Sequence, residues 1–150
     1  MWNLLPAERL QEWREFRLNL NNLSLEQAIQ ETSHLWSYAP FVKRYLSYDL
    51  PENWPNPWEL LHDNYYCDLA KALGMFYTLY LSSHYNVSIT DLALEVYQDH
   101  EEKELQYIVS VNKGKYILNM IFDTVLNKKS ITKNLRLKNR HTANSLHLSF

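Results

Sequence analysis

Residues 54–81 read WPNPWELLHDNYYCDLAKALGMFYTLYL, and this stretch decides the fold. It opens with a loop that tryptophan and proline make bulky and stiff, and it continues into the longest apolar helical pattern of the chain. A helix that is apolar over so much of its circumference is expected at the centre of a fold. The side chains that make this broad face are Leu69, Leu73, Phe76, Tyr77, Tyr80 and Leu81.

Two residues of this stretch carry specific expectations. Gly74 in mid-helix costs up to about 1 kcal/mol relative to Ala, so the sequence predicts that another element packs closely against it. Cys67, the only cysteine, is expected in the first turn of a helix that we place at about residues 65–83, capped by Asp63 or Asn64. A single cysteine excludes an intramolecular disulfide and a cysteine-rich metal site.

Helices are also predicted before this stretch. Residues 7–20 place apolar side chains at helical spacing and follow a proline suited to a first helical turn. A second helix covers residues 24–36, where Ser24 followed by Gln27 is a capping-box pattern. Pro57 is suited to the first turn of a short helix inside the opening stretch.

After His84 the helical periodicity gives way to alternation. Residues 92–98, 104–111 and 115–122 alternate and are rich in Tyr, Ile and Val, which predicts three strands. Short turns join them, and Gly114 in the second turn can adopt a positive φ, so they form an antiparallel meander. Helices followed by a meander predict an α+β fold in which the Cys-bearing helix packs on the sheet.

The charge distribution separates a body from a tail. The chain of 150 residues has 15 Lys or Arg, 17 Asp or Glu and a formal net charge of −2. From residue 128 to the C-terminus there are six Lys or Arg and no Asp or Glu. We therefore predict a single α+β domain over residues 1–127 and a basic extended tail over residues 128–150 that becomes ordered on a partner.

Several classes of protein are excluded by composition and pattern. No window approaches the ~18 apolar residues of a membrane span, and the N-terminus lacks the pattern of a secretory signal, so no membrane partner is expected. No Gly-rich phosphate loop is present. No cofactor or metal is expected, because His62 and Asp63 beside Cys67 find no second pair of ligands at a useful spacing.

Four sequence blocks resemble the transglutaminase-like, papain-related cysteine hydrolase superfamily: YCDLAKALGMFYTLYLS, DLALEVYQD, LQYIVSV and GKYILNMIFDTVLN. The resemblance covers about residues 60–120 and implies a nucleophilic Cys on a helix, followed by strands that carry a His and then an Asp. Matching the strands by order puts the His position on Gln106 or a neighbour and the Asp position on Asn119, so only Cys67 keeps the residue type of the superfamily. A helix N-terminus stabilises a thiolate, but Gln cannot act as a general base. The nearest other base is His100, several residues out of register.

A second resemblance covers roughly residues 10–127. The run from WREFR through WPNPWELL to the Cys-bearing helix is similar to small uncharacterised proteins of tailed phages, especially cyanobacterial myophages. It implies a phage gene product, located in the virion or in the host cytoplasm.

Three functions are considered. The favoured one is a non-catalytic phage structural or assembly protein on a degenerate transglutaminase-like scaffold, with other phage or host proteins, or a second copy of itself, as partners. The second is a cysteine hydrolase or acyl transferase with Cys67 as nucleophile and His100 or His62 as base. The third is a host-targeting phage protein that binds a host protein or nucleic acid through the tail.

Partner-binding residues are predicted in two places. The aromatic loop offers Trp54 and Trp58, because tryptophan is enriched at protein interfaces. The tail offers its six basic side chains, Lys128, Lys129, Lys133, Arg136, Lys138 and Arg140.

Overall fold

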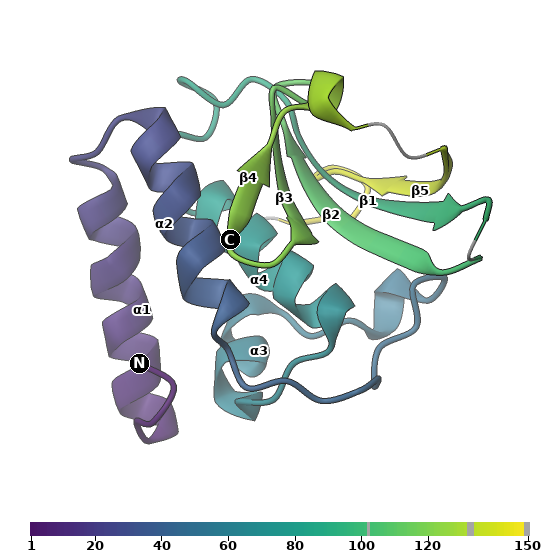
Figure 1. Ribbon diagram of the computed structural model, residues 1–150. Helices are drawn as coiled ribbons and strands as arrows, with labels where there is room; N and C mark the ends of the chain where they lie inside the picture. Colours follow the sequence, from purple (N-terminus) through teal and green to yellow (C-terminus); the bar gives the residue numbers. More distant parts are fainter. Residues whose placement is uncertain (102, 132–133, 149–150) are drawn as a thin grey trace.

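The computed structural model describes residues 1–101, 103–131 and 134–148. Helices come first and an antiparallel sheet follows (Figure 1), so the predicted α+β fold is confirmed. The helices are α1 (Pro6–Leu20), α2 (Leu25–Ser37), α3 (Pro57–Asp63) and α4 (Asp68–Tyr80), with 3-10 turns η1 (Pro51–Asn53) and η2 (Lys128–Ser130). The strands are β1 (Leu92–Asp99), β2 (Leu105–Val111), β3 (Tyr116–Ile121), β4 (Thr124–Leu126) and β5 (Leu135–His141).

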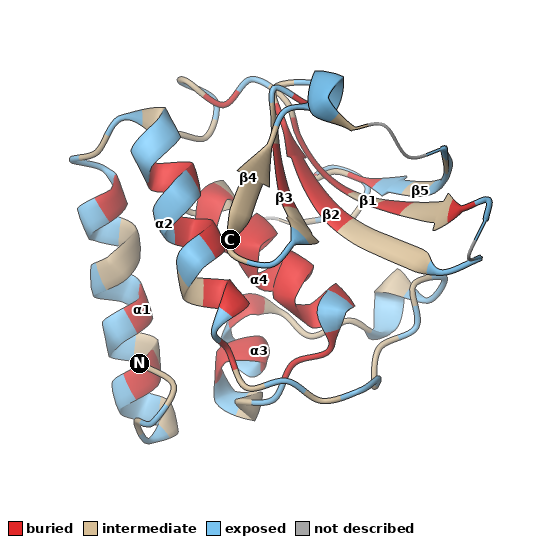
Figure 2. Cartoon of the chain, in the orientation of Figure 1, coloured by how far each residue is buried: buried red, intermediate tan, exposed pale blue. Residues whose placement is uncertain are grey.

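Helix α4 is the centre of the molecule. The sheet has the order β4-β3-β2-β1-β5 with antiparallel neighbours, and β1, β2 and β3 pack on one side of α4. Helices α2 and α3 also pack against α4, and α1 packs against α3 and α2 (Figure 1). Every residue from Leu69 to Leu79 is buried, as the continuous red of α4 in Figure 2 shows. The broad apolar face of this helix therefore has the central position that the sequence predicts.

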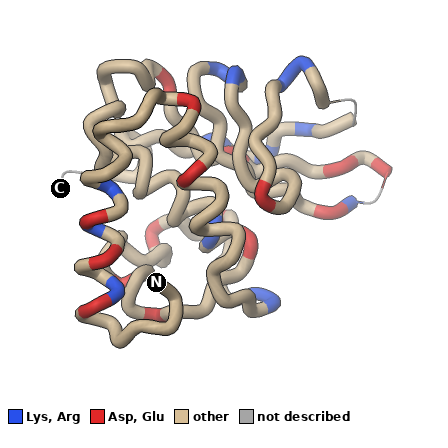
Figure 3. The backbone as a smooth tube through the Cα atoms, turned by 60° about the vertical axis from the view of Figure 1, so that its left-hand side comes forward, with Lys and Arg blue, Asp and Glu red and all other residues tan. Residues whose placement is uncertain are grey.

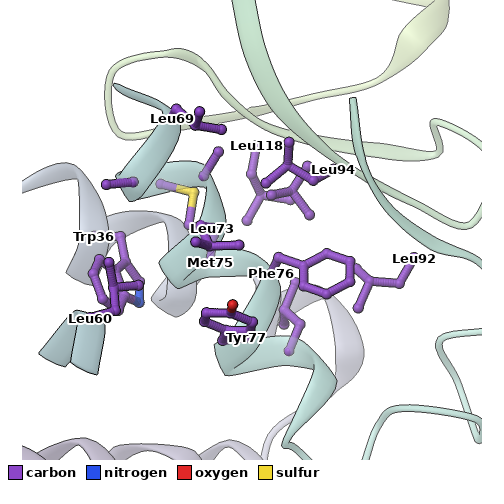
Figure 4. Close-up of a cluster of buried hydrophobic side chains, with 14 of the residues drawn as sticks. Trp36, Leu60, Leu69, Leu73, Met75, Phe76, Tyr77, Leu92, Leu94 and Leu118 are labelled. Atoms are coloured by element: carbon purple, nitrogen blue, oxygen red, sulfur yellow. The ribbon is translucent and has the colours of Figure 1, made fainter. Parts of the chain in front are cut away.

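The core is built on the apolar side chains of α4. Figure 4 shows Leu69, Leu73, Met75 and Phe76 of this helix together with side chains from the elements around it. Those partners come from α2, α3, β1 and β3, namely Trp36, Leu60, Leu92, Leu94 and Leu118. Burying one such side chain stabilises the fold by about 1.5–3 kcal/mol, so the core provides most of the stability.

Gly74 and Thr78 of α4 hold the tryptophans of α1 and α2. A Cβ atom at Gly74 would lie 2.5 Å from three ring atoms of Trp36, which confirms the predicted close packing. The hydroxyl of Thr78 accepts hydrogen bonds from Trp13 Nε1 (3.0 Å) and Trp36 Nε1 (2.9 Å). It donates in turn to the carbonyl of Gly74 (2.7 Å). One buried hydroxyl thus joins three helices.

Helix α4 begins later than the sequence predicts. Asn64 has a left-handed conformation (φ 55°) and ends α3, so it does not cap α4. Tyr66 is held outside the helix, because its N–H donates to the carbonyl of Pro40 and its carbonyl accepts from the N–H of Val42. The predicted start near residue 65 is therefore wrong, and Cys67 is the N-cap of α4.

The other predicted boundaries are close to those observed. Ser24 and Gln27 form the predicted capping box of α2. Residues 112–114 of the β2–β3 turn all have positive φ, which suits the short connection. After β3, Asp123 has φ 50° and reverses the chain into β4.

The C-terminal region belongs in large part to the sheet. Residues 135–141 form β5, which pairs with β1 from Leu94↔His141 to Asp99↔Leu135. A separate tail was expected after residue 127, and for residues 135–141 this expectation is corrected. The alternation in this segment produces a strand that pairs with the edge of β1 in the same chain. No helix in the described ranges is long and apolar enough to cross a bilayer.

We predict that Thr78→Val destabilises the protein by about 2–5 kcal/mol, because it leaves two buried indole N–H groups without an acceptor. Urea unfolding followed by circular dichroism measures the change. Thr124→Val is the matched control, since its hydroxyl bonds only to a carbonyl in the exposed β3–β4 turn, and it should change stability by less than about 0.5 kcal/mol. Equal unfolding midpoints for the two variants would contradict the role of Thr78.

Candidate functional site

The candidate site is a groove that crosses the N-terminus of α4. Its larger part, about 610 Å³, lies between residues 41–48, Cys67 and the adjoining ends of β1 and β2. A smaller hollow of about 160 Å³ shares three lining residues with it, Asp68, Leu105 and Tyr107. Together these two parts are called the Cys67 groove below.

Cys67 is a free, almost fully buried thiol, with 4% of its surface exposed. It is the N-cap of α4, and its side chain makes no capping hydrogen bond. Among the described residues, no histidine hydrogen-bonds to its sulfur. A catalytic thiol needs a base within hydrogen-bond reach, and the described part of the chain supplies no such pair.

Tyr107, rather than Gln106, faces the helix beside Cys67. Gln106 lies opposite Tyr97 in the sheet, and directly opposite residues share a face. Tyr97 lines a cavity on the side of the sheet away from α4. Gln106 lines the smaller hollow of the groove, but not the larger part that contains Cys67. Tyr107 lines both parts, so of these two neighbours it is the one that lies beside Cys67.

The phenol of Tyr107 is not a base at neutral pH. Burial raises the pKa of Tyr107, the Arg44 guanidinium opposes this, and the nearby groups of Cys67 and Asp68 raise it further. The phenol therefore stays protonated through the neutral range and can donate a hydrogen bond without taking the thiol proton.

Asn119 reaches the site through an irregularity in β3. It has φ 71°, and the β3–β4 register shifts between Ile117 and Ile121. Such a bulge re-aims a side chain, here towards α4. Asn119 Nδ2 donates to the carbonyls of Tyr107 (2.9 Å) and Asp68 (3.0 Å). The carboxamide thus fixes β2 and β3 to the start of α4, and its N–H groups bond to main chain rather than to a ring that could act as a base.

The structure does not bring the predicted bases to the thiol. His100 lies exposed in the turn after β1, and His62 lies exposed near the end of α3. Neither residue lines the Cys67 groove. No group of three or more His, Cys, Asp or Glu within the described ranges is arranged to hold a metal ion.

The two tryptophans of the aromatic loop have different surroundings. Trp54 Nε1 donates to the carbonyl of Ser47 (2.8 Å), and its ring lies 5.0 Å from the ring of His141. Trp54 therefore packs against the end of β5. Trp58 is 43% exposed and contacts Trp13 edge-on, with ring centroids 5.9 Å apart. Of the two, Trp58 is the more exposed.

The basic residues predicted to bind a partner do not form one patch, and Figure 3 shows Lys and Arg distributed over several parts of the chain. Lys128 and Lys129 lie in η2, Arg136 and Lys138 are exposed on β5, and Lys133 lies outside the described residues. Of these, Lys138 lines the Cys67 groove.

Arg140 is already engaged within the sheet. It pairs with Asp91 (2.7 Å) and Glu95 (3.3 Å). These two carboxylates raise the pKa of Arg140 against the opposing effect of burial. Its charge is therefore largely compensated by the protein itself.

The groove is also lined by residues that were not predicted from the sequence, among them Lys43, Arg44, Lys103 and Tyr107. The orientation of Tyr107 could have been predicted, because Val109 and Val111 face the core and the period of two along a strand puts Tyr107 on the same side. The three cations lie in irregular segments, which carry no periodic signal.

Comparison with known proteins supports the fold. No family model matches the sequence, and no curated protein matches it. The solved structure of Legionella pneumophila LapG (calcium-bound) is similar, with a TM-score of 0.71, 13% sequence identity, and coverage of 91% of this chain and 75% of that chain. At this identity the likeness shows that the two chains share a fold. Nothing in the comparisons supports a phage origin.

We predict that His141 makes stability fall in acid. Burial lowers the pKa of His141, and its Nε2 is buried without a partner. The folded state therefore resists protonation, and stability is lost as the pH falls below the ordinary value of 6.5. His141→Gln should reduce the difference in unfolding free energy between about pH 7.5 and about pH 5.5, measured by urea unfolding.

His100→Gln is the control for this measurement, because the side chain of His100 is exposed. It should keep the pH dependence of the wild type. A pH dependence that is equal in the wild type and in His141→Gln would show that His141 does not contribute.

Proposed function

We propose that this chain is a non-catalytic transglutaminase-like protein that binds a segment of a partner protein in the Cys67 groove. The observation that carries the proposal is Tyr107, which faces the groove beside Cys67 on the strand where the superfamily carries its His. A phenol of raised pKa does not activate a thiol.

The surroundings of Tyr107 support binding without turnover. The N–H groups of the Asn119 carboxamide are used on two main-chain carbonyls, and Cys67 is almost fully buried. The catalytic arrangement of a nucleophile, a base and an orienting group is thus replaced by groups that fix the main chain. The groove itself remains open beside them.

Exposed aromatic rings near the smaller hollow favour a protein as the partner. Phe122 lines this hollow, is 62% exposed and lies 5.0 Å from the ring of Tyr38. Phe41, in the wall of the larger part, is also exposed and lies under the ammonium of Lys71. Exposed aromatic groups beside a groove are typical of protein interfaces.

A cysteine hydrolase is the second candidate. The sequence resemblance to the cysteine hydrolase superfamily implies this activity, and the likeness to LapG is one of fold. Here Cys67 is the N-cap of the 13-residue α4, where the unpaired main-chain amides favour a thiolate. This function would require a base other than Tyr107.

A phage origin, and a virion or host-cytoplasm location, stay predictions from sequence resemblance.

Labelling of Cys67 with iodoacetamide distinguishes the two candidates. We expect the native protein to label much more slowly than the urea-unfolded protein at every pH, because Cys67 is almost fully buried and no described base hydrogen-bonds to its sulfur. Mass spectrometry of native protein over a pH series measures the rate, and Cys67→Ser gives the background. A labelling midpoint below about 7 would overturn the non-catalytic proposal.

Substitution at Tyr107 tests whether this position governs the thiol. Tyr107→His should speed labelling of Cys67 near neutral pH, because an imidazole there can take the proton. Tyr107→Phe is the matched control, since it keeps the ring but provides no base. Equal labelling rates in the two variants would show that residue 107 does not act on Cys67.

A further inference from the structure

Four exposed cationic side chains line the larger part of the Cys67 groove. Lys43 and Arg44 come from the segment after α2, Lys103 from the β1–β2 turn and Lys138 from β5. All four are exposed, and none forms a salt bridge with another described residue. They lie on different walls of one groove, although they are far apart in sequence.

This concentration of positive charge contrasts with the rest of the chain. The groove has five Lys or Arg, counting the buried Lys71 of the smaller hollow, and two carboxylates, Asp68 and Glu104, whereas the whole chain has 15 basic and 17 acidic residues. A groove in which charges of one sign dominate attracts a ligand of the opposite charge. The charge of the groove therefore selects an acidic partner, which the acidic remainder of the protein would otherwise repel.

The main chain of one wall is also free. Within the described structure, the N–H and C=O groups of residues 43–46 make no hydrogen bond, although Val42 before them bonds to Tyr66 and Ser47 after them accepts from Trp54. Unpaired main-chain groups along a groove can bond to an incoming extended segment. The wall thus offers both main-chain hydrogen bonds and cationic side chains.

We propose that the occupant of the Cys67 groove is an acidic, extended protein segment. Its carboxylates pair with the four cations, and its main chain bonds to residues 43–46. This inference rests on the proposed function and deepens it by giving the chemical class of the partner.

A protein segment suits the groove better than nucleic acid. A polynucleotide needs a continuous basic track for its phosphates. Here Asp68 and Glu104 lie among the cations, and Lys128 and Arg140 line a separate cavity on the other side of the sheet. Separate carboxylates on a peptide can pair with the cations individually.

Fluorescence anisotropy with two short fluorescein-labelled peptides tests the proposal. One peptide alternates glutamate and leucine, and the other has glutamine in place of every glutamate. We expect the glutamate peptide to bind at least about tenfold more tightly than the glutamine peptide. Its affinity should fall as NaCl is raised, because the cations are exposed and screened.

Two double variants with the same change in net charge locate the binding. Lys43→Glu/Lys138→Glu changes two walls of the groove and should weaken binding of the glutamate peptide at least about tenfold. Arg14→Glu/Lys115→Glu changes two exposed cations that do not line the groove, and should leave the affinity within about twofold. Circular dichroism of both variants checks that the fold is kept.

Four results would overturn the proposal of an acidic partner: equal binding of the two peptides, no binding of either, equal losses of affinity in the two double variants, or tighter binding of a single-stranded oligonucleotide in the same assay.

Failure of the proposed function would give results that differ from these four. Cleavage of the glutamate peptide by the wild type, seen by mass spectrometry, would overturn the non-catalytic function and leave the acidic partner standing. Groove-dependent binding of both peptides with equal affinity would keep the function and remove the acidic specificity.

Discussion

The hydroxyl of Thr78 is the interaction on which the rest of the structure depends. It accepts hydrogen bonds from two buried tryptophans, and Gly74 one turn earlier leaves room for the ring of Trp36. Because α1 and α2 are both fixed to α4 at this point, the orientation of α4 is set from the side opposite the sheet. The N-terminus of the same helix carries Cys67 and a wall of the groove. The position of the candidate site is therefore a consequence of how the helices pack.

The frame of the candidate site can be separated from its chemistry. A cysteine stands at the start of the central helix, and two strands lie beside it. Tyr107 lies near this cysteine, and its phenol supplies no base at neutral pH. Asn119 fixes the two strands to α4 through main-chain carbonyls, so it defines the geometry of the site. A fold likeness at 13% sequence identity thus describes the scaffold, and the function has to be inferred from the residues of the site.

Local patterns in the sequence predicted the elements well where one physical signal dominates. The capping box at Ser24, the apolar face of α4 and the close packing at Gly74 each follow from interactions within a few residues or from a clear steric demand. The start of α4 was not predictable in this way, because Tyr66 is held out of the helix by main-chain bonds to Pro40 and Val42. The cations of the groove come from loops and an edge strand, so only tertiary structure brings them together.

The free edge of β5 bears on the solubility of the protein. An exposed strand edge is a template for pairing with another chain, and a sequence with 14% aromatic residues would aggregate readily through such an edge. Arg136 and Lys138 project from β5 as exposed cations, and two copies of this edge laid side by side would bring like charges together. The like charges of Arg136 and Lys138 therefore disfavour edge-to-edge pairing of two copies through β5, whatever segment the groove binds.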